Sequence, residues 1–146
     1  MTPRLLAKFL RLSAADRSLL IRSVLLLGAT RLALWLLPFS AARRLFARPP
    51  RPRSDARATE DRIAWAISVA QRFVPQATCL PQALAAEALL TRDGHPAELR
   101  FGVLKSDRGR VVAHAWVESA GRIVVGELHG GLDRLTPMPT LPGARP

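Results

Sequence analysis

The chain contains one cysteine and one well-placed histidine that together could form a thiol–imidazole pair. Cys79 directly precedes an Ala- and Leu-rich segment with helical spacing. Pro81 suits the first turn of that helix, because its missing N–H would have no intrahelical acceptor there. Thr78 is the predicted N-cap and Gly94 the predicted left-handed residue after the helix. The positive end of the helix dipole favours the thiolate, which is the nucleophilic form of cysteine. A small buried apolar role for this cysteine is the alternative.

Of the three histidines, His114 is the one flanked by apolar residues of a predicted strand. His95 lies in a predicted turn, and His129 lies in a Gly-rich loop. An imidazole held on a strand could deprotonate the Cys79 thiol and later protonate a leaving amine. A third group is expected to orient such an imidazole. The alternative is a core histidine bonded to the backbone.

The third group depends on the hairpin that follows His114. A two-residue loop at Ala120-Gly121 would place His114 opposite Glu127, whereas a three-residue loop would place Gly126 there. Asp133, in the following loop, is a further candidate if that loop folds back. Glu127 is therefore the predicted third catalytic residue, with an ordinary charge at the end of a strand as the alternative.

The surrounding pattern predicts an α+β domain. A helix is expected from Thr59, with acidic residues in its first turn, to a stop at Pro75, and the cysteine helix follows. After Gly94 the apolar period changes from helical to alternating. Strands are expected at about residues 97–103, 111–118 and 123–127, joined by Gly-containing turns. They form an antiparallel meander behind two helices. Residues 130–146 contain four prolines and are expected to be irregular.

The sequence divides into a helical extension at residues 1–47, a Pro- and Arg-rich linker at 48–58, a core at 59–136 and a tail at 137–146. Arg22 and Arg31 interrupt the apolar run 19–37, which argues against a membrane span. They are nine positions apart, on opposite faces of one straight helix. Gly28 is a candidate break between two helices. We expect this extension to pack on the core or dock a partner, with membrane-surface association as the alternative.

Composition narrows the class of protein. The chain has 146 residues, 49% of them hydrophobic, which excludes an intrinsically disordered protein. A single cysteine allows no internal disulfide and fits a cytoplasmic protein. The net charge of +11 comes almost entirely from arginine and suits an acidic partner or membrane surface. Aromatic residues are only 5%, and no basic–aromatic pattern of nucleic-acid binding is present. No metal site is expected.

Several motifs resemble those of the lasso-peptide leader peptidases, which are transglutaminase-like, papain-like cysteine proteases. The resemblance covers roughly residues 59–128 and rests on Thr-Cys-Leu-Pro-Gln-Ala-Leu-Ala at 78–85 and His-Ala-Trp-Val-Glu at 114–118. It implies that Cys79 is the nucleophile and His114 the base. The family usually has an Asp as third member at about the position of Gly126, so this chain departs from the pattern. Either Glu127 substitutes, or a dyad works with another orienting group.

The resemblance also implies a role in making ribosomally synthesised peptides. The enzyme would remove the leader peptide from a lasso-peptide precursor, presented by a separate leader-recognition protein. A cyclase similar to asparagine synthetase would then use the released amine. ATP dependence is associated with some members, but the sequence has no phosphate-binding Gly-rich loop and no cofactor site is assigned. The alternatives are a catalytically degenerate module that binds the precursor or cyclase, and an amide-forming acyltransferase.

Overall fold

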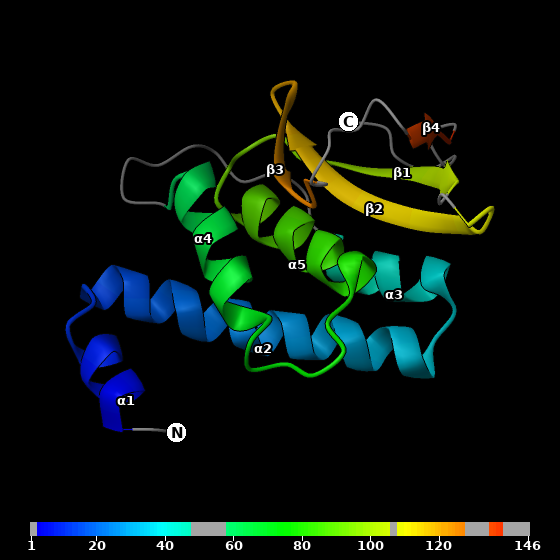
Figure 1. The fold of residues 1–146 in the computed structure, drawn as a ribbon. Helices are drawn as coiled ribbons and strands as arrows, with labels where there is room; N and C mark the ends of the chain where they lie inside the picture. The colour runs from blue at the N-terminus through cyan, green and yellow to red at the C-terminus, as the bar shows by residue number, and fades with distance from the viewer. Residues whose placement is uncertain (1–2, 48–57, 106–107, 128–134, 139–146) are drawn as a thin grey trace.

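A computed structural model describes residues 3–47, 58–105, 108–127 and 135–138 of the chain. Within them, five helices pack on one side of a four-stranded antiparallel sheet (Figure 1), as the α+β prediction requires. The elements in chain order are α1 Pro3–Leu10, α2 Ala14–Leu36, α3 Phe39–Phe46, α4 Glu60–Ala70, α5 Cys79–Arg92, β1 Glu98–Lys105, β2 Val111–Ser119, β3 Arg122–Val125 and β4 Leu135–Pro137.

The two central helices begin where the sequence predicts. The Thr59 side chain accepts a hydrogen bond from the Arg62 amide and caps α4. Thr78 occupies the N-cap position of α5, but its side chain makes no capping hydrogen bond. Cys79 is the first helical residue. Gly94 follows the end of α5 with φ +82°, the left-handed conformation that glycine adopts without strain.

The strands are ordered β3-β2-β1-β4, and all the pairs are antiparallel. The predicted meander is confirmed for β1, β2 and β3. The expectation of an irregular tail is wrong for residues 135–137, which form β4 along the free edge of β1. Pro137 has no N–H to donate to the ladder, but it is tolerated because β4 is an edge strand.

The hydrophobic core forms between three layers (Figure 1), with the sheet at the top, α4 and α5 in the middle and α2 beneath them. The middle layer includes Leu84, Leu89 and Ile63, each 0–1% exposed. Leu27 of α2 joins the same buried cluster. The N-terminal helices therefore share one core with the residues expected to form the catalytic part. The linker lies largely outside the described residues.

Helix α2 is continuous through Gly28, so the expected break there is wrong. A Cβ at this position would contact nothing within 4 Å, and one residue without a helical preference does not interrupt a helix held by packing. Thr30 is fully buried and donates to the Pro81 carbonyl at 3.1 Å, which ties α2 to the first turn of α5. By its length and mean hydropathy of 1.7, α2 would suffice to cross a membrane, although 39% of its apolar stretch is buried in the protein.

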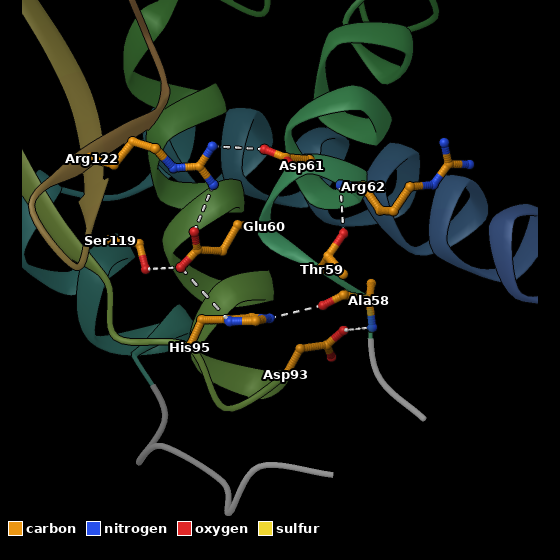
Figure 2. A network of polar contacts seen from close by, with 9 residues as sticks. All are labelled: Ala58, Thr59, Glu60, Asp61, Arg62, Asp93, His95, Ser119 and Arg122. Carbon is orange, nitrogen blue, oxygen red and sulfur yellow. Dashed lines mark hydrogen bonds and ion pairs between the residues drawn. The ribbon is translucent and has the colours of Figure 1, made fainter. Parts of the chain in front are cut away.

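A polar network holds the start of α4 against the β2–β3 hairpin and the end of α5 (Figure 2). Glu60 accepts a hydrogen bond from Ser119 and pairs with Arg122 at 2.7 Å. The backbone of Ala58 is held at both ends, since its N–H donates to Asp93 and its carbonyl contacts Nε2 of His95. The hydrogen bond from Ser119, followed by that from Arg122, lowers the pKa of Glu60.

We expect this network to contribute to stability in a pH-dependent way. Because the folded pKa of Glu60 is lowered, its contribution is complete above the unfolded value of about 4.5. The contribution is lost as the pH falls below that value through the folded pKa. Glu60→Gln should cost about 2 kcal/mol at neutral pH and flatten the acid limb of the stability profile, measured by urea unfolding. Asp61→Asn is the matched control; Asp61 pairs with the same Arg122, but its side chain is 80% exposed, so the cost should stay below about 1 kcal/mol. Equal losses in the two variants would contradict this account.

Candidate functional site

The thiol of Cys79 lies at the N-terminus of α5 and is partly exposed. It packs at the edge of the hydrophobic core. Thr78 does not cap the helix, and among the described residues no acceptor is bonded to the amides of Cys79 and Leu80. Two N–H groups and the positive helix end are therefore available to an oxyanion formed next to the sulfur.

The imidazole of His114 is held by a backbone carbonyl. Its Nε2 lies 2.6 Å from the oxygen of Gly126. A carbonyl can only accept, so Nε2 carries the proton and Nδ1 keeps its lone pair in the neutral ring. The ring also stacks on Trp116, with centroids 6.2 Å apart and planes inclined by 16°. Trp116 in turn donates to Glu118 at 2.8 Å. These contacts fix the ring orientation and leave Nδ1 as the basic nitrogen.

Gly126 can hold His114 because it has no side chain. Its φ is +95°, and a Cβ there would lie 2.8 Å from both the Ala115 oxygen and the Trp116 Cβ. The backbone thus approaches β2 more closely than any other residue would permit. In this conformation the position cannot carry the Asp that the resemblance would place near it, and the peptide carbonyl takes the orienting role.

The pairing that set Glu127 opposite His114 is wrong. The hairpin begins as predicted, with Ser119 opposite Arg122 and Glu118 opposite Ile123. A register shift follows, so that Val117 pairs with Val125 rather than with residue 124. The bulge in β3 moves every later residue by one position. Glu127 is exposed, and among the described residues it makes no hydrogen bond to His114. Asp133 lies outside the described residues.

The two principal candidates, Cys79 and His114, lie toward the same end of the domain. Helix α5, with 14 residues, is about 20 Å long. Gly102, the β1 partner of His114, lies about 13 Å along β1 from Glu98, the end that follows α5. His114 is therefore on the part of the sheet nearer to the N-terminal half of α5.

Their side chains are not hydrogen-bonded to one another in the described part of the chain. Ala115 and Val117 of β2 belong to the core beneath the sheet, where α5 packs. His114 alternates with them and lies on the other face, together with Trp116. Each side chain is thus held by its own neighbours, and no hydrogen bond between Cys79 and His114 is present among the described residues. Their catalytic roles stay predictions.

The carbonyl of Gly126 and the ring of Trp116 were missed as site residues. The three-residue-loop alternative had pointed to Gly126 as the residue opposite His114, and the spacing of Trp116, two residues after His114 on a strand, is the signal for the stacking. No group of three or more His, Cys, Asp or Glu side chains among the described residues could hold a metal ion.

The fold and these residues define an α+β domain with a cysteine at the start of its central helix and a histidine on the neighbouring sheet. The family model described as the transglutaminase-like superfamily matches residues 23–140. The chain belongs to that superfamily. The match begins inside α2, in keeping with a core that includes the N-terminal helices. Neither the curated proteins nor the solved structures contain a significant match to the chain.

Proposed function

We propose that this chain is a cysteine peptidase that removes the leader from a ribosomally made lasso-peptide precursor. Membership of a superfamily that typically contains Cys–His enzymes supports the reaction class. The observation that carries the proposal is the hydrogen bond from His114 Nε2 to Gly126, which leaves Nδ1 as a base of defined tautomer. The Cys-Leu-Pro and His-Ala-Trp-Val-Glu signatures give the substrate class by resemblance.

The chemistry follows from the two groups. Nδ1 of His114 takes the thiol proton of Cys79, and the thiolate attacks the carbonyl carbon of the scissile peptide bond. The resulting oxyanion accepts hydrogen bonds from the free amides at the start of α5. The C–N bond breaks as the imidazolium protonates the leaving amine, which becomes the N-terminus of the core peptide. Water, deprotonated by the same imidazole, then hydrolyses the thioester and releases the leader acid. Because His114 lies on the face of the sheet turned away from α5, this sequence requires a rearrangement of β2 or of the start of α5 that brings Nδ1 to the sulfur.

The test is to incubate the purified chain with a lasso-type precursor and its separate leader-recognition protein, and to measure the masses of the products by mass spectrometry. Hydrolysis gives a leader acid and a core peptide with a free amine, whose summed mass exceeds that of the precursor by one water. An acyltransferase would instead give a leader amide when an amine is added. Intact precursor under all conditions would reject the peptidase.

A second candidate is a non-catalytic module that binds the precursor or the cyclase. It is favoured by the absence of a hydrogen bond between Cys79 and His114 among the described residues, and by the carbonyl in place of a carboxylate.

The reactivity of the thiol separates the two candidates. In a peptidase, His114→Ala should slow iodoacetamide alkylation of Cys79 near neutral pH by about tenfold or more, because the imidazole no longer accepts the proton. His95→Ala removes a histidine of the Glu60 network and is the control; it should leave alkylation unchanged. If alkylation is equally fast in the wild type and both variants, the binding module is the better description.

A further inference from the structure

Helix α2 carries an apolar stripe on the face turned away from the core. Its residues are large and exposed and recur at helical spacing: Ile21 at 49%, Leu25 at 68%, Leu32 at 52%, Trp35 at 76% and Leu36 at 62%. The stripe covers about a third of the circumference of the helix. The opposite face, which includes Leu27 and Thr30, is fully buried. No described residue covers the stripe, and Figure 1 shows α2 on the side of the molecule opposite the sheet.

Arginines border this stripe on both sides. Arg22 and Arg31 are nine positions apart, which places them on opposite edges of the stripe at about 100° per residue. This separation gives an apolar band with a cation at each edge. Arg22 also pairs with Asp93 at 3.7 Å, although 48% of its side chain stays exposed, and Arg31 donates to Gln76. Long cationic side chains at the edges of an apolar band can exchange such partners for a polar surface while their stems stay on the band.

The short helix α1 also exposes large apolar side chains. It buries none of its eight residues, and Leu5, Leu6 and Leu10 are exposed. A shallow hollow between α1 and α2 is lined by the apolar side chains of Phe9 and Ile21 and by Arg17 and Arg22. Arginines beside apolar side chains suit a phosphate group attached to an acyl chain, and Arg22 would share its charge between that phosphate and Asp93.

The charge of the whole region selects an anionic occupant. Residues 1–47 contain eight Lys or Arg against one acid, Asp16. That acid is already paired with Arg62 of α4 at 3.0 Å. A long helix with an exposed tryptophan, an aliphatic band and flanking cations has the features of a helix lying in a membrane interface.

We propose that α1 and the outer face of α2 form a docking surface for an anionic lipid bilayer, with α2 lying in the plane of the interface. The helix does not span the membrane, because its inner face belongs to the protein core. Docking on this side leaves the opposite, sheet side of the domain facing water (Figure 1). A peptide-processing site near α5 and the sheet would stay accessible from solution.

The test uses the full chain and vesicles of phosphatidylcholine with or without phosphatidylglycerol. We expect co-sedimentation with the anionic vesicles alone, weakening as salt is added. Leu25→Glu with Leu32→Glu should reduce the partition coefficient by about tenfold or more. Val111→Glu with Val112→Glu is the matched control; it makes the same change of charge at residues that are 71% and 50% exposed on β2. Its partition coefficient should fall by no more than about twofold.

Tryptophan emission provides a readout that does not depend on folding of the glutamate variants. Trp35 is 76% exposed and Trp116 only 4%. Anionic vesicles should shift the emission to shorter wavelength, and brominated lipids should quench it, in the wild type but not in Trp35→Phe. Absence of binding at low salt, or equal losses in the stripe and control variants, would overturn the proposal. A third result would also overturn it: the wild type self-associates in light scattering but does not bind vesicles, and the stripe variant no longer self-associates. The stripe would then bind a second copy of the chain.

Discussion

Cys79→Ala is expected to stop cleavage of the precursor, with kcat/KM lowered by about 10³-fold or more. The substitution removes the atom that would form the thioester and leaves water as the only nucleophile. Because the side chain is small and partly exposed, the fold should be retained. The measurement is the rate of leader release, followed by mass spectrometry, at matched concentrations of precursor and recognition protein.

Two controls make this result interpretable. Cys79→Ser keeps a side chain of similar shape, but its hydroxyl is a much weaker nucleophile than a thiolate, so its activity should also be near background. The circular dichroism melting curves of both variants should match that of the wild type. Cleavage that persists in Cys79→Ala, with the protein free of contaminating protease, would remove the proposed nucleophile and the peptidase assignment with it.

Gly126→Ala is expected to destabilise the domain by about 3 kcal/mol. The positive φ of +95° disfavours any residue with a side chain, by about 1–2 kcal/mol. The new Cβ would also meet the backbone and Cβ of Trp116 and the oxygen of Ala115 at 2.8–2.9 Å, which adds about 1–3 kcal/mol of overpacking. Because the same segment orients His114, activity should fall even at temperatures where the variant stays folded. Urea unfolding and the cleavage assay measure the two effects.

Other glycines separate the two causes. Gly121→Ala shares a positive φ, +79°, but has no neighbour within 4 Å, so only the conformational cost of about 1 kcal/mol should appear. Gly28→Ala has open space and lies inside α2, where alanine should stabilise the helix by about 0.5–1 kcal/mol. A Gly126→Ala variant no less stable than Gly121→Ala would contradict the close approach to β2. Gly126→Asp tests the family pattern directly; we expect it to lose stability as well, not to restore a triad.

The sequence by itself determined the local elements and the candidate groups. Pro81 and Gly94 marked the ends of the cysteine helix, and the change of period after Gly94 marked the strands, because each signal acts over a few residues. The superfamily was inferred from a resemblance carried by short segments around Cys79 and His114, and the family model that matches residues 23–140 confirms it. The finer assignment to leader peptidases rests on the same segments and stays a proposal.

Tertiary structure decided what depends on contacts between distant segments. The bulge in β3 moved Glu127 away from the position opposite His114, and the Gly126 carbonyl contacts the imidazole instead. Residues 123–125 are all apolar, so no alternation of apolar and polar residues marked the bulge in the sequence. Likewise, α2 stayed continuous through Gly28 because packing on α4 and α5 outweighs one weak helix former. The same packing decided which face of α2 is buried, and therefore that its arginines flank an exposed apolar band. Strand register and burial depend on contacts between segments that are far apart in the sequence. Helix caps, turns and apolar periodicity depend only on residues that are close together in the chain, so the sequence reveals them directly.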